Sequence, residues 1–117
     1  MGSELKKRFL GLDREAKTRF LALTLNSLTI TARYLFKRID QNQTGDGTEK
    51  LRKLNEVTHV LSAKLLGYLE GDAGQYPDGV IVDIVVGRAG DEFSEEVLGA
   101  MKFAIDELEH GSRRLPA

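Results

Sequence analysis

The chain has 117 residues and a mass of 13.0 kDa, with 41% apolar and 30% charged residues, and this composition predicts one small globular domain with an ordinary core. Cysteine is absent, which excludes disulfides and thiolate metal sites. The longest uncharged runs fall short of the roughly 20 apolar residues that cross a bilayer, so we expect no transmembrane helix, no membrane partner and a cytoplasmic location.

The formal net charge of −1 averages two halves of opposite sign. Residues 1–40 carry nine Lys or Arg against four acids, whereas residues 71–117 carry four against ten. We therefore expect the first and last helices of one bundle, or of two subunits, to pack beside each other with complementary charges. The alternative is that the basic end binds nucleic acid or an anionic membrane, but the acidic half would repel the same phosphates. Binding to DNA or RNA is accordingly expected to be absent, or weak, non-specific and sensitive to salt.

Glycine-rich and polar stretches at 41–47, 71–79 and 87–91 divide the chain into segments with helical periodicity. The predicted helices lie at about 13–40, 48–70, 78–87 and 92–110, after a lead-in segment at 1–12 and before a flexible tail at 111–117. The residues expected to cap their N-termini are Asp13, then Asp46 or Thr48, Asp78, and finally Asp91 or Ser94, while Gly71 and Gly111 close the second and last helices. The sequence thus predicts a single all-α domain over 1–117, a compact bundle of about four helices with a long central first helix.

The predicted helix at 13–40 is apolar around most of its circumference and has only one narrow polar stripe. A helix of this kind needs neighbours on more than one side. It would also be about 42 Å long, which is more than a monomer of this size requires. We therefore expect part of its apolar surface to meet a second copy of the chain, giving a homodimer.

Two stretches also fit β-strands. Residues 23–31 alternate between apolar and polar side chains as a hairpin would, and residues 80–86 are rich in β-branched residues. The flanks of the first stretch are strong helix formers in continuous phase, and a lone strand at 80–86 would need a partner. The helical interpretation is preferred, and a small sheet stays open as the alternative.

Both histidines of the chain lie in Glu-x-x-His pairs, Glu56 with His59 and Glu107 with His110. Di-iron bundles use two such pairs and add a Glu from each of two further helices. Residues 16–39 contain no acid, so this set is incomplete. We expect neither a metal site nor a cofactor, with His59 at the surface and His110 near the carbonyls at a helix end.

Arg33 lies on the polar stripe of the first long helix, where its guanidinium would suit a carboxylate or phosphate group. The alternative is that Arg33 pairs with Glu56 or Asp83 between helices, or faces water. If a ligand pocket exists, its predicted polar lining is Asn26, Thr29, Arg33, Asn55, Glu56 and His59.

No serine is placed as a nucleophile, because Ser27, Ser62 and Ser94 lack the sharp strand-to-helix turn that catalytic serines use. We expect no catalytic residue. The predicted function is that of a small helical interaction or regulatory protein that pairs with itself and with a protein partner. The alternative is a bundle that binds a small ligand or metal through Arg33, Glu56 and His59.

Three runs of the sequence resemble a group of short, uncharacterised bacterial helical proteins over about residues 13–86. They are Leu-Thr-Ile-Thr-Ala-Arg at 28–33, Leu-Arg-Lys-Leu-Asn-Glu-Val-Thr-His at 51–59 and Tyr-Pro-Asp at 76–78. The resemblance implies a helical fold and supplies no activity.

Overall fold

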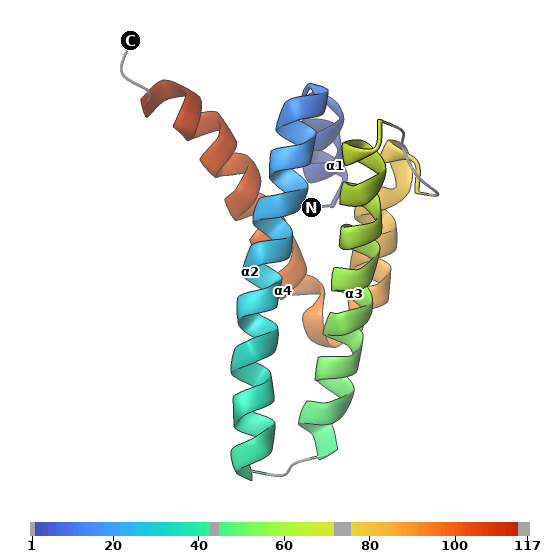
Figure 1. The fold of residues 1–117 in the computed structure, drawn as a ribbon, viewed down its shortest axis with the longest axis vertical. Coiled ribbons are helices and arrows are strands. Elements are labelled where there is room, and N and C mark those ends of the chain that lie inside the picture. The colour runs from blue at the N-terminus through green and yellow to red at the C-terminus, as the bar shows by residue number, and fades with distance from the viewer. Residues whose placement is uncertain (1, 43–44, 72–75, 115–117) are drawn as a thin grey trace.

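The computed structural model describes residues 2–42, 45–71 and 76–114, and within these ranges it contains helices and no strand (Figure 1). The helices are α1 (Gly2–Leu10), α2 (Arg14–Asn42), α3 (Gly45–Leu69) and α4 (Asp78–Arg114). The all-α prediction is confirmed. Both strand-like stretches are helical, since residues 23–31 lie inside α2 and residues 80–86 lie inside α4.

The predicted helix count and the position of the first helix are wrong. α4 bends at Gly90, so the described residues form five helical segments rather than about four. The first helix is the short α1, and the long helix predicted at 13–40 is the second one, α2. The lead-in segment becomes a helix because Leu5 and Phe9, one turn apart, bury their side chains in the core.

Several helix ends follow the predicted signals. Asp13 caps α2, because its Oδ1 accepts a hydrogen bond from the backbone N–H of Ala16 at 2.8 Å. Gly71 closes α3 with a φ of 92°, and its N–H donates to the carbonyl of Tyr68 at 3.1 Å. The start of α2 and the end of α3 therefore follow from the local chemistry of Asp13 and Gly71.

Two other boundaries differ from the prediction. α3 begins at Gly45, before both of its expected caps, and α4 continues past Gly111 to Arg114. The predicted flexible tail at 111–117 is therefore partly helical, and its last three residues lie outside the described residues.

Gly90 separates the two parts of α4. Its φ of 69° and ψ of −179° are non-helical, and the positive φ is one that residues other than glycine rarely adopt. The first part of α4 packs along α3, and after the bend the last part crosses toward α1 and α2 (Figure 1). The predicted break between helices at 78–87 and 92–110 is thus present as a sharp bend.

The core is built from one apolar stripe of each helix. The rings of Phe9 and Phe20 meet with centroids 5.1 Å apart, and both side chains are fully buried together with Leu61, Val85 and Met101. Each such side chain contributes about 1.5 to 3 kcal/mol through removal of apolar surface from water. This core joins α1 to the other three helices.

One end of the molecule extends beyond this core. The distal halves of α2 and α3 form a hairpin that projects past the bend in α4 (Figure 1). The radius of gyration is 14.9 Å, whereas a compact domain of this length has about 13.4 Å. The accessible surface is 7390 Å², whereas a compact monomer of this mass exposes about 6,300 Å².

Candidate functional site

The six polar residues predicted to line a ligand pocket do not enclose one. Asn26, Arg33, Asn55 and His59 are exposed, while Thr29 and Glu56 are partly buried. The Thr29 hydroxyl donates to the Leu25 carbonyl at 2.8 Å, and Glu56 accepts a hydrogen bond from Arg52 at 3.0 Å on its own helix. None of the six lines either of the two cavities described below.

The two acids considered as partners of Arg33 pair with other residues. Asp83 accepts a hydrogen bond from Lys6 at 2.9 Å, and Glu56 pairs with Arg52. Arg33 faces outward on α2 with an exposed side chain. Of the alternatives weighed for this residue, exposure to water is the one that the structure supports.

The Glu-x-x-His pairs are not joined into a metal site in the part of the chain that the structure describes, where no group of three or more His, Asp or Glu side chains is placed to hold an ion. His59 is exposed on α3. The side chain of His110 lies outside the described residues.

A buried polar cluster joins α2, α3 and the start of α4. Its centre is Asp78, whose Oδ1 accepts hydrogen bonds from Lys64 at 2.7 Å and from the Tyr68 hydroxyl. The second oxygen, Oδ2, accepts one from Lys17 at 2.9 Å. Lys64 is fully buried and donates to the Tyr76 carbonyl as well. Asp78, expected only as a helix cap, therefore also ties three helices together.

The electrostatics of this cluster keep Asp78 ionised. Burial raises the pKa of the Asp78 carboxyl, but hydrogen bonds from Lys64, Tyr68 and Lys17 outweigh burial and hold the pKa well below its usual range. Burial, followed by the hydrogen bond to Asp78, raises the pKa of Tyr68 well above its usual value. A carboxyl that is ionised and a phenol that is protonated throughout the neutral pH range are not suited to proton transfer there. The cluster is suited to holding helices in place.

Arg14 extends the cluster along its outer side. Its Nη2 donates to the Tyr68 carbonyl at 3.0 Å, and its guanidinium lies 4.9 Å from the centre of the Tyr68 ring. Lys64 Nζ lies 4.7 Å from the same ring centre. Tyr68 thus receives cations on its ring while its hydroxyl donates to Asp78.

The basic N-terminal helix is bound to the acidic last helix. Arg8 Nη2 lies 2.9 Å from Asp106 Oδ1 and 2.8 Å from Glu109 Oε2, and Lys6 Nζ lies 2.9 Å from Asp83 Oδ2. These pairs join opposite charges within one chain, but they are made by the lead-in segment and not by the helix predicted at 13–40. These pairs are partly exposed, so each contributes about 1 kcal/mol or less.

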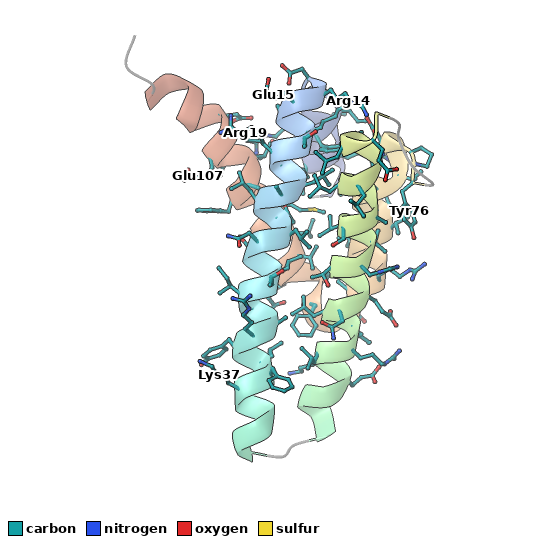
Figure 2. The ribbon with its side chains drawn as sticks, in the orientation of Figure 1. Arg14, Glu15, Arg19, Lys37, Tyr76 and Glu107 are labelled. Atoms are coloured by element: carbon teal, nitrogen blue, oxygen red, sulfur yellow. The ribbon has the colours of Figure 1, made fainter. Side chains whose placement is uncertain are left out.

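Two cavities open on the surface near this junction. One, of about 360 Å³, lies between α1 and the last part of α4 and is lined by Glu4, Leu5, Arg8, Glu95, Leu98, Gly99 and Lys102. The other, of about 320 Å³, lies where α2 begins and is lined by Leu12, Asp13, Glu15, Ala16, Arg19, Leu108 and Glu109. Figure 2 shows Glu15 and Arg19 at this end of α2. Arg8 and Glu109, the ion pair described above, each contribute to one of the two linings.

Large apolar side chains remain exposed on the long helices. Ile30 and Tyr34, one turn apart on α2, are 58% and 62% exposed, and Phe36 is 62% exposed. On α4, Phe103 is 55% exposed. Ile30 and Tyr34 share one face of α2, and exposed apolar surface of this kind often marks a binding site. This exposed surface is the strongest candidate for a functional site.

Comparison of the chain with protein-family models, with curated proteins and with solved structures finds no match. Within the described ranges, no helix combines the length and apolar character needed to cross a membrane. The resemblance to short bacterial helical proteins therefore stays a prediction. The functional argument rests on the geometry of this chain.

The Asp78 cluster is the feature that the sequence analysis missed. Lys64 follows Val57, Val60 and Leu61 in the phase of the buried stripe of α3, four residues before Tyr68. A lysine in such a position must find an acceptor if it is buried. That phase, combined with an acid at the start of a helix, is the signal that would have pointed to the cluster.

Proposed function

We propose that this protein is a small, non-catalytic interaction protein that forms a homodimer through the exposed side of α2. The observation that carries the proposal is the pair Ile30 and Tyr34, which expose more than half of their side chains on consecutive turns. Association would remove this apolar surface from water.

The size of the molecular surface supports the same proposal. The accessible surface exceeds that of a compact monomer by about 1,000 Å². A stable interface buries about 800 Å² on each partner. The excess surface of the whole chain is therefore of the amount that a dimer would bury.

The arrangement of the charged groups supports an interaction role over a catalytic one. The groups with strongly shifted pKa values, Asp78 and Tyr68, bond to each other and to Lys64 in a packed cluster. The alternative ligand site has less support, because Glu56 is bound by Arg52 and His59 is exposed.

Weak, salt-sensitive binding to nucleic acid also follows from the contacts. The basic residues expected to contact phosphate are Lys6, Lys7, Arg8, Arg14 and Lys17. Lys7 is exposed, whereas the other four already donate hydrogen bonds to acceptors of the protein. Few phosphates would be neutralised without breaking these contacts, and affinity would fall steeply with salt.

Light scattering coupled to gel filtration tests the dimer. At micromolar concentration the wild-type chain should give about 26 kDa, twice the mass of one chain. Ile30→Asp combined with Tyr34→Asp should give a monomer, whereas Leu66→Asp, at a comparably exposed position on α3, should leave the dimer intact. A wild-type mass of about 13 kDa at every concentration would overturn the proposal.

A further inference from the structure

We infer that in this homodimer the exposed basic face of α2 packs against the exposed acidic face of α4 of the second copy, and the reverse, around a two-fold axis. The inference rests on the proposed self-association and adds to it the partner surface. It is supported by the residue composition of each face, by the positions of the two faces on the molecule, and by the charge repulsion expected if α2 packed against α2 of the second copy.

The α2 face combines apolar and basic side chains. Ile30 and Tyr34 are four residues apart, as are Arg33 and Lys37, and all four are exposed. No acid occurs anywhere in residues 16–39 to neutralise this face along the helix. Its partner surface should therefore be apolar at the centre and acidic at the edges.

The last part of α4 carries a stripe with that character. Glu96, Gly99, Phe103 and Glu107 recur at spacings of three and four residues, and all four are exposed. Phe103 lies in the middle with 55% of its surface exposed, one turn from each of two neighbours. At Gly99, one turn before Phe103, a Cβ atom would have no neighbour within 4 Å, so this part of the helix surface is open. An aromatic side chain such as Tyr34 suits this position, because aromatic pairs favour offset or edge-to-face contact.

The positions of the two faces favour a contact between copies over a contact within one chain. In Figure 2, Lys37 and Glu107 lie on the same side of the molecule, Lys37 toward the hairpin end of α2 and Glu107 on the last part of α4. A two-fold axis that lies in the plane of that side, perpendicular to the long direction of the molecule, exchanges the two ends and brings Lys37 of one copy opposite Glu107 of the other. Such an isologous arrangement makes each contact twice.

Pairing α2 with α2 of the second copy is less favourable. It would place Arg33 and Lys37 of the two copies near each other, within a stretch, residues 16–39, that contains no acid. Like charges brought together at an interface oppose association, whereas complementary charges select the partner surface. The acidic stripe of α4 therefore fits the α2 face better than a second α2 does.

Charge reversal tests the inference. One variant carries Arg33→Glu and Lys37→Glu, and a second carries Glu96→Lys and Glu107→Lys. Each variant alone opposes like charges at both contacts, so its dissociation constant should rise at least about tenfold. An equimolar mixture restores opposite charges at both contacts, and light scattering should then show a dimer containing one chain of each kind. Lys7→Glu with Lys50→Glu changes the net charge equally at exposed positions elsewhere and should leave the dissociation constant unchanged.

The possible results separate this inference from the proposed function. Circular dichroism and urea midpoints close to wild type would show that the variants fold. Two monomeric variants that form a dimer when mixed would support the pairing of α2 with α4. If the wild type is a dimer and the reversed variants dimerise as tightly, or stay monomeric when mixed, the pairing is wrong while self-association stands. A monomeric wild type would overturn both.

Discussion

The two ends of the helix pair formed by α2 and α3 differ in how far their side chains are buried. At the closed end, where α1 and the start of α4 pack, Phe9, Phe20 and Lys64 are fully buried. At the open end, where the hairpin extends beyond the bend in α4 (Figure 1), Tyr34 and Phe36 of α2 are each 62% exposed. The closed end thus holds the aromatic core and the buried lysine, although Leu66 and Leu69 of α3 are exposed there as well, at 56% and 66%.

The difference also shows in the polar groups. The closed end places a cluster of charges in a packed site, where specific geometry is needed to offset the cost of removing them from water. At the open end Arg33 and Lys37 are exposed. The closed end is therefore suited to fixing the fold.

Removing the central acid of the closed end should have the largest effect. Asp78→Ala leaves the fully buried Lys64 without its carboxylate partner, so we expect the free energy of unfolding to fall by about 3 kcal/mol. Urea denaturation measures this change. Asp83→Ala is the matched control, because it removes an exposed pair with Lys6 and should cost about 1 kcal/mol or less. Equal losses in the two variants would show that the cluster has no special role.

Replacing Gly90 at the bend in α4 should have the next largest effect on the free energy of unfolding. Gly90→Ala forces a side chain into a φ of 69°, and we expect a loss of about 2 kcal/mol in the free energy of unfolding. The added Cβ would also lie 3.2 Å from Lys53 Nζ, a flexible group that can move aside. Gly87→Ala, in the regular helix with open space around it, should instead gain about 0.5 to 1 kcal/mol. A neutral Gly90→Ala would mean that the bend does not require glycine.

Lowering the pH should reduce the contribution of Asp78 to the free energy of unfolding. Because the pKa of Asp78 is lower in the folded chain than in the unfolded chain, its stabilising contribution is complete above about pH 5 and declines as the pH falls below about 4. The difference in unfolding free energy between wild type and Asp78→Asn should therefore shrink from pH 6 to pH 2. Urea titrations across this range measure it. A difference that stays constant with pH would contradict the role assigned to the Asp78 carboxylate.

The sequence predicted the features that depend on neighbouring residues. The cap at Asp13 and the break near Gly90 are local, since each follows from one residue and its own backbone. The pairing of opposite charges between the basic and acidic parts of the chain was also predictable, because opposite net charge favours that neighbourhood.

The features that depend on tertiary packing were not predictable in the same way. Lys64 meets Asp78 across a connection between α3 and α4, and spacing alone does not reveal that meeting. The helix formed by the lead-in segment likewise depends on the burial of Leu5 and Phe9 against other helices. The prediction of a pocket around Arg33 was based on polar residues that share one face of a helix. Residues on a shared face need not line a concave site.

Amide hydrogen exchange at two protein concentrations tests the division between the ends most directly. If the open end mediates association, the protection of amides in 30–37 of α2 and in 96–107 of α4 should rise with concentration, because dimer formation slows their opening. Amides in 14–21 of α2, at the closed end, should exchange at rates that change little. Protection that is independent of concentration at 30–37, or that rises mainly at 14–21, would contradict the account.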